Sequence, residues 1–113
     1  MKVIVAGGRD FIPLPKHRSW LIRILQQLET KIVVCGTAKG ADLYGKQIAE
    51  EFNLAVLEFP AKWNEFGKSA GYKRNVETAK VADACILFPG GKGTEHMKNI
   101  AKEYGLKVIE YIE

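Results

Sequence analysis

An apolar run leads directly into a cluster of glycines in Ala84-Cys85-Ile86-Leu87-Phe88-Pro89-Gly90-Gly91-Lys92-Gly93-Thr94. Residues 84–88 have the composition of a buried strand, and the polar run that follows the glycines is typical of a helix. A glycine turn at a helix N-terminus leaves backbone N–H groups accessible, and the helix dipole there favours negative charge. The sequence therefore predicts an anion site at residues 89–94, suited to a phosphate-bearing ligand.

Four more apolar runs lack the strict alternation of a half-buried strand: Lys2–Ala6, Lys31–Cys35, Leu54–Phe59 and Lys107–Ile112. Segments with helical spacing separate the runs, around 20–28, 41–52, 69–81 and 94–104, and Gly105 ends the last of them. Strands that are apolar on both faces and alternate with helices predict a parallel sheet covered on both sides. We expect an α/β fold, a three-layer Rossmann-like sandwich whose five parallel strands have the order 3-2-1-4-5.

Ligands of such sheets bind beyond the carboxyl ends of the strands, where the strand order reverses. In the order 3-2-1-4-5 the turns after the first, second and fourth strands should therefore converge. The glycines and polar residues of these turns are the predicted ligand contacts: Gly7, Gly8, Arg9 and Asp10; Gly36, Gly40 and Asp42; Pro89, Gly90, Gly91, Gly93 and Thr94. The middle group is equally well explained as a plain strand-to-helix connection.

Individual roles follow from the chemistry of these side chains. Arg9 would contact a phosphate or a base, and Asp10 would hold Arg9 or bond a ribose hydroxyl. Thr94 would cap the last helix and donate its hydroxyl to an oxyanion. Arg74 and Asn75 open the third helix, where they either lean over the crevice or face solvent.

The segment 60–67 is predicted as a long irregular loop after the third strand, and such loops are often functional. Its Trp63 either packs the loop or offers a flat surface to a base. His96 is expected near the crevice and His17 on the surface. Cys35 and Cys85 lie in or at the end of apolar runs, as expected of buried, reduced thiols.

Several common sites are excluded by single residues. Gly93 stands where a Walker A loop needs Ser or Thr, and Ile12 stands at the third glycine position of a dinucleotide fingerprint. No cysteine or histidine spacing suggests a metal, so we expect neither a metal nor a cofactor.

The composition places the chain in a broad class. Its 113 residues are enough for one domain, expected over 1–113, and 47% of them are hydrophobic. The net charge of +4 suits an anionic ligand, but the lysines are scattered, so nucleic acid is an unlikely partner. No apolar run is long enough for a membrane span and the N-terminus does not read as a signal peptide, so we expect a cytoplasmic protein.

Five groups of residues are specific in combination: Gly7-Gly8-Arg9-Asp10-Phe11, Gly36-x-x-x-Gly40-Ala41-Asp42, Phe59-Pro60-Ala61-x-Trp63, Gly67-x-x-Ala70-Gly71-x-x-Arg74-Asn75, and Ala82-Asp83 with Phe88-Pro89-Gly90-Gly91-x-Gly93-Thr94. Together they resemble the YspA-like branch of the SLOG superfamily over nearly the whole chain. That superfamily is Rossmann-like and includes LOG phosphoribohydrolases, molybdenum-cofactor carriers, the DNA-processing protein DprA and sensors of NAD-derived signals. The resemblance implies a bacterial or phage source and a possible homodimer that pairs through helices, with Trp20 at the interface or in the core.

The resemblance also bears on catalysis. The LOG enzymes use an Arg, to which Arg74 corresponds, together with the final Glu of a PGGxGTxxE motif. Met97 occupies that Glu position here, and Glu95 lies two residues earlier, about 200° away around a helix. We therefore expect binding of a nucleotide or an ADP-ribose-like ligand, as a sensor or to sequester a signalling nucleotide. The alternatives are a nucleoside-monophosphate phosphoribohydrolase with Arg74 as its candidate catalytic residue, and a single-stranded nucleic-acid binder.

Overall fold

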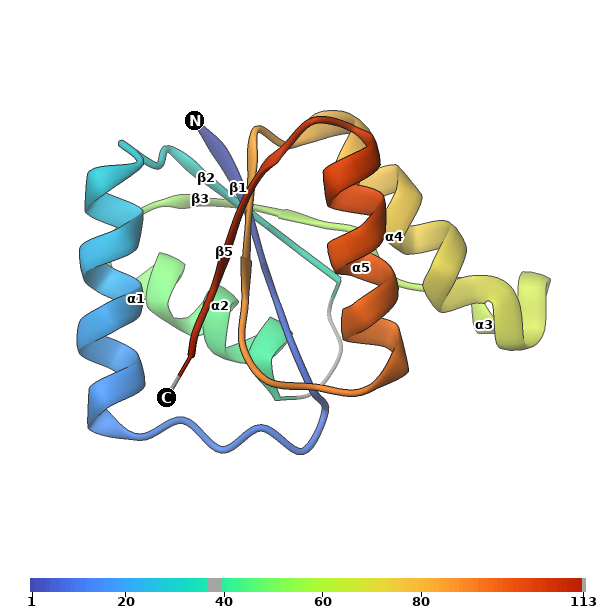
Figure 1. The fold of residues 1–113 in the computed structure, drawn as a ribbon, viewed down its shortest axis with the longest axis horizontal. Coiled ribbons are helices and arrows are strands. Elements are labelled where there is room, and N and C mark those ends of the chain that lie inside the picture. Colours follow the sequence, from blue (N-terminus) through green and yellow to red (C-terminus); the bar gives the residue numbers. More distant parts are fainter. Residues whose placement is uncertain (37–39, 113) are drawn as a thin grey trace.

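The computed structural model describes residues 1–36 and 40–112 as a sheet of parallel strands between two layers of helices (Figure 1). The strands are β1 (Lys2–Ala6), β2 (Ile32–Cys35), β3 (Ala55–Glu58), β4 (Ala84–Leu87) and β5 (Lys107–Glu110). The helices are α1 (Pro15–Gln27), α2 (Ala41–Glu51), α3 (Trp63–Phe66), α4 (Ala70–Val81) and α5 (Lys92–Glu103), with a 3-10 turn at Gly67–Ser69. The strand order β3-β2-β1-β4-β5 confirms the predicted fold class.

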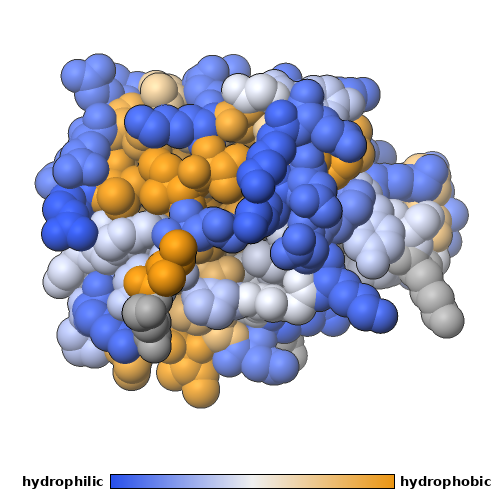
Figure 2. All heavy atoms as spheres, viewed as in Figure 1, coloured by the Kyte–Doolittle hydropathy of each residue, from blue (hydrophilic) through white to orange (hydrophobic). Residues whose placement is uncertain are grey.

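Alternate side chains of the central strands enter two separate cores. Val3 and Val5 of β1 pack with α1 and α2 on one face, whereas Ile4 packs with α4 and α5 on the other. These central strands are apolar on both faces, as the sequence indicated, because each face is buried in one of the two cores. The expectation is wrong for the edge strands β3 and β5, which are partly exposed because each has one neighbour. Figure 2 shows apolar side chains between α1 and α5, over the β5 edge.

Two expected boundaries are corrected. The segment 60–67 is not an irregular loop, because α3 and the 3-10 turn form within and just after it. The last helix begins at Lys92 rather than Thr94, and Gly91 takes the N-cap position without a side-chain cap. Thr94 is therefore inside the first turn and does not cap the helix.

The first helix carries a histidine that the sequence placed wrongly. His17 is buried, its Nδ1 accepts a hydrogen bond from the Leu14 N–H at 2.8 Å, and its ring packs edge-on against Phe11 and Tyr111. A polar ring on an apolar helix face could not be separated from a surface residue by pattern alone. Trp20 contacts Tyr111 in the same cluster, so its ring contributes to the core.

The two cysteines are buried, as expected. Burial raises the pKa of the Cys85 thiol to about 12, and the Asp42 carboxylate adds to the shift. This thiol therefore stays protonated and unreactive at neutral pH. Within the described part of the chain, no helix is long and apolar enough to cross a membrane.

Candidate functional site

The backbone of Gly8 joins the three turns that were predicted to converge. The Gly8 N–H donates to the Pro89 carbonyl at 2.9 Å, and the Gly8 carbonyl accepts from the N–H of Ala41, the first residue of α2, at 3.2 Å. A Cβ on Gly8 would lie 3.0 Å from the Pro89 oxygen and 3.1 Å from Gly90 Cα. Glycine is needed here because the two turns approach so closely. These contacts confirm that the turns meet where the strand order reverses.

A cavity of about 420 Å³ opens at this meeting point, between α4, α5 and the carboxyl ends of β1 and β2. Most of the predicted ligand contacts line it: Gly7, Gly8, Arg9, Gly36, Asp42, Trp63, Arg74, Asn75, Gly91, Gly93 and Thr94. We call this cavity the crevice.

Four predicted residues, Asp10, Gly40, Pro89 and Gly90, are not among its lining. Gly40 has φ +75°, and a Cβ there would overlap the Gly8 carbonyl oxygen. A Cβ on Gly90 would overlap the Thr94 hydroxyl. These two glycines are explained by packing, and the Asp10 side chain is exposed outside the crevice.

The crevice also has lining residues that the sequence reading missed, among them Cys35, Gly71, Tyr72 and Thr78. Gly71, Arg74, Asn75 and Thr78 follow helical spacing and share one face of α4. Extending the prediction along this face from Arg74 would have found Gly71 and Thr78. Cys35 directly precedes Gly36 at the end of β2.

The first turn of α5 provides the anion-binding chemistry of the crevice. The Glu95 N–H is the first to bond within the helix, to the Gly91 carbonyl at 3.0 Å, so the preceding amides have no intrahelical acceptor. Gly91, Gly93 and Thr94 line the crevice. A Cβ on Gly91 or Gly93 would meet nothing within 4 Å. This helix start is thus accessible to a ligand, with its partial positive charge facing the crevice.

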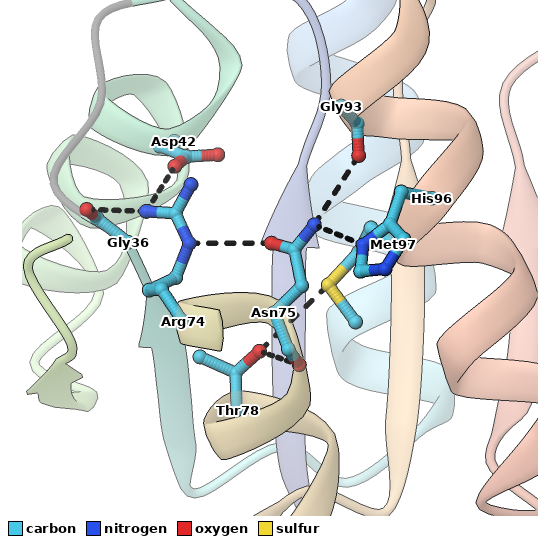
Figure 3. Close-up of polar contacts among 8 residues, drawn as sticks. All are labelled: Gly36, Asp42, Arg74, Asn75, Thr78, Gly93, His96 and Met97. Atoms are coloured by element: carbon cyan, nitrogen blue, oxygen red, sulfur yellow. Dashed lines mark hydrogen bonds and ion pairs between the residues drawn. The ribbon is translucent and has the colours of Figure 1, made fainter. Parts of the chain in front are cut away.

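Arg74 forms the opposite wall (Figure 3). Its Nη1 donates to the Gly36 carbonyl at 2.6 Å and lies 3.7 Å from Asp42 Oδ2. Both side chains are largely buried, at 16% and 7% exposure, so each charge compensates the other in a poorly solvated place. A Cβ on Gly36 would overlap the guanidinium, so a side chain there would displace Arg74 from this position.

Asn75 connects this wall to α5. Its Oδ1 accepts from Arg74 Nε at 3.2 Å, and its Nδ2 donates to the Gly93 carbonyl at 3.3 Å (Figure 3). The same nitrogen lies 3.1 Å from His96 Nδ1, which accepts the bond in the tautomer that carries its proton on Nε2. The Asn75 amide therefore positions Arg74 and the start of α5 relative to one another. His96 sits behind this amide, in ring contact with Tyr72.

Met97, which the resemblance places at the position of the LOG glutamate, carries an apolar side chain that lines the crevice. Met97 is buried, with its sulfur 3.7 Å from the Thr78 hydroxyl. Glu95 is exposed and lines a separate, smaller cavity with Lys98 and Glu110, on the side of α5 that its helical rotation predicted. Among the described lining residues, Asp42 is the sole carboxylate, and it faces Arg74. In the described residues no cluster of three or more potential metal ligands occurs.

Comparison with known proteins adds one relative. No model of a known protein family matches the chain, and no solved structure matches it. The chain is 38% identical over 88 residues to the Gene 61 protein of Mycobacterium phage D29, an alignment that covers 71% of this chain and 70% of the phage protein. The chain therefore belongs to the same family as the Gene 61 protein of Mycobacterium phage D29.

Proposed function

We propose that this protein binds a nucleotide or an ADP-ribose-like phosphorylated molecule in the crevice, with a phosphate on the first turn of α5. The main support is the open start of α5, where Gly91 and Gly93 line the crevice and leave open the space that a side chain would fill. The residue motifs that resemble the YspA-like branch of the SLOG superfamily support the same assignment.

Gly93 is difficult to explain without a ligand. Glycine in a helix is about 0.8–1.0 kcal/mol less favourable than alanine, and the space around this residue would accept a methyl group. A phosphate that approaches the backbone amides at hydrogen-bond distance explains the missing side chain. Arg9 and Arg74 add positive charge to the same cavity, opposed by Asp42 alone among its described lining residues.

The size of the crevice indicates the size of the ligand. Small-molecule sites usually have volumes of about 300–1,000 Å³, and the crevice lies toward the low end at about 420 Å³. This volume suits a mononucleotide. The second half of an ADP-ribose-like molecule would project through the open side.

Binding is better supported than cleavage of the N-glycosidic bond. A hydrolase of the LOG type needs a carboxylate beside the bond to be broken, and Met97 holds that position. Asp42 is engaged with Arg74 and is poorly placed to replace it. A binding role fits either a sensor or, for a phage-encoded protein like its relative, sequestration of a signalling nucleotide.

Isothermal titration calorimetry with AMP, ADP-ribose and cyclic ADP-ribose isomers tests the proposal. At least one ligand should bind the wild-type protein. Gly93→Ala should weaken that binding tenfold or more, because a lost hydrogen bond to a charged group costs about 1.5–3 kcal/mol. Asn99→Ala, an exposed change on the same helix outside the crevice, is the matched control and should leave affinity unchanged. Absence of heat with every ligand at millimolar concentration would reject the proposal.

A further inference from the structure

Trp63 has an unusual setting for a large aromatic side chain. It is 48% exposed and belongs to neither hydrophobic core, yet it lines the crevice. It opens α3, which Figure 1 shows at the far end of α4, away from the sheet. An ideal Cβ on Gly71 would lie 3.5 Å from the tip of the indole, so the ring rests near a helix position that carries no side chain. Core packing therefore does not account for this tryptophan.

The face of the indole is partly covered by a side chain from another turn. The Arg9 guanidinium carbon lies 5.7 Å from the Trp63 ring centroid. Arg9 comes from the turn after β1, is exposed, and lines the crevice as well. A cation–π contact at such an exposed place is weak, so a planar ligand group can replace it.

The spacing shows how a ring would enter. A flat ring in contact with both groups needs about 7–8 Å between them, because stacked atoms lie about 3.5–4.0 Å apart. Arg9 therefore has to withdraw by about 2 Å, or leave the indole, to admit such a ring. An exposed arginine at a turn can make this movement without disturbing the sheet.

Phe66 on the same short helix is a natural comparison. The Lys73 amine lies 4.4 Å from its ring centroid, closer than Arg9 lies to Trp63. Phe66 is not among the lining residues of the crevice. The two aromatics thus lie on the same short helix, and each has a cation of its own beside its ring. Of the two, Trp63 lines the crevice and Phe66 does not.

We infer that Trp63 is the stacking surface for a planar aromatic group of the ligand, its nucleobase, and that Arg9 leaves the indole as the base enters. This inference rests on the proposed function, since the phosphate on α5 anchors the same molecule. Phosphate recognition alone does not require a base. Stacking on Trp63 does, so the affinity should depend on the base and on an aromatic residue at position 63.

Calorimetry with AMP and with ribose 5-phosphate distinguishes base stacking on Trp63 from phosphate binding at the start of α5. AMP should bind more tightly than ribose 5-phosphate to the wild-type protein. Trp63→Leu should weaken AMP about 5- to 100-fold, the range expected for loss of one base–aromatic stack, and leave ribose 5-phosphate unchanged. Trp63→Phe should keep most of the AMP affinity. Phe66→Leu, the matched control, should change neither ligand.

A fluorescence titration tests the same contact without altering it. The chain has two tryptophans, so Trp20→Phe leaves Trp63 as the single reporter. AMP should change its emission, and ribose 5-phosphate should not. Equal affinities for AMP and ribose 5-phosphate, or equal losses for both in Trp63→Leu, overturn the stacking site while the phosphate site stands. Binding of neither probe overturns the stacking site, and it rejects the phosphate site as well if ADP-ribose and its cyclic isomers also give no heat.

Discussion

Two helices start at the carboxyl edge of the sheet after glycine-bearing turns, and they differ in what occupies their first amides. At α2, the Ala41 N–H is taken by the Gly8 carbonyl, and Gly36 and Gly40 are fixed by close contacts with Arg74 and Gly8. At α5, a Cβ on Gly91 or Gly93 would meet nothing within 4 Å, and the first turn lines the crevice. Similar sequence patterns therefore have different causes. The closed start serves the fold, and we assign the open start to the ligand.

The strongest test of the closed start is its buried ion pair. Arg74→Met should lower the free energy of unfolding by about 3 kcal/mol, because it leaves the Asp42 carboxylate buried without its cation. Urea denaturation measures this loss. The double variant Arg74→Met with Asp42→Leu should recover most of it. No recovery would show that the pair is not what stabilises this wall.

A slightly smaller loss of stability is expected from a change in the turn that precedes α2. Gly40→Ala should destabilise the protein by about 2 kcal/mol, since it places a Cβ at φ +75° and against the Gly8 carbonyl. Denaturation curves for Gly40→Ala and Gly91→Ala provide the direct contrast. An equal loss in both variants would remove the distinction between the closed and open starts.

The open start should contribute less to stability. Gly91→Ala should lower the free energy of unfolding by less than about 1 kcal/mol, because nothing lies within 4 Å of the new methyl group and the remaining cost is that of alanine at an N-cap. The same variant should bind AMP at least tenfold more weakly in calorimetry, because a side chain there restricts the approach to the α5 amides. A stable variant with undiminished binding would place the phosphate elsewhere.

The smallest effect concerns a pair remote from both starts. Hydrogen bonds from Arg18 of α1 hold the pKa of Glu51, at the end of α2, below its ordinary value. The pair therefore contributes stability above the unfolded-state pKa of Glu51 and loses it as pH falls toward the lowered folded value. Arg18→Gln should raise the Glu51 pKa, as read by NMR titration. Ligand affinity at neutral pH should not change.

The sheet order and the convergence of three turns were predictable because strand composition and chain order constrain a parallel sheet strongly. The lining residues Arg9 and Gly93 followed from that topology, whereas the sequence left Arg74 open between the crevice and solvent. The sequence could not show that Gly40 and Gly90 serve packing. Glycine occurs both in tight turns and in ligand-binding loops, and only the neighbours that a Cβ would meet distinguish the two. Nor could it show that the Asn75 amide is used between α4 and α5, since that depends on atoms 18 and 21 residues away.

The most direct test is an amide NMR titration of the wild-type protein with AMP and ADP-ribose. The amide signals of Lys92, Gly93 and Thr94 should shift strongly and saturate with ligand. The Ala41 amide, already bonded to the Gly8 carbonyl, should move little. Absence of any saturating shift with both ligands, or shifts at Ala41 that exceed those at Gly93, would contradict the assignment of the open helix start as the phosphate site.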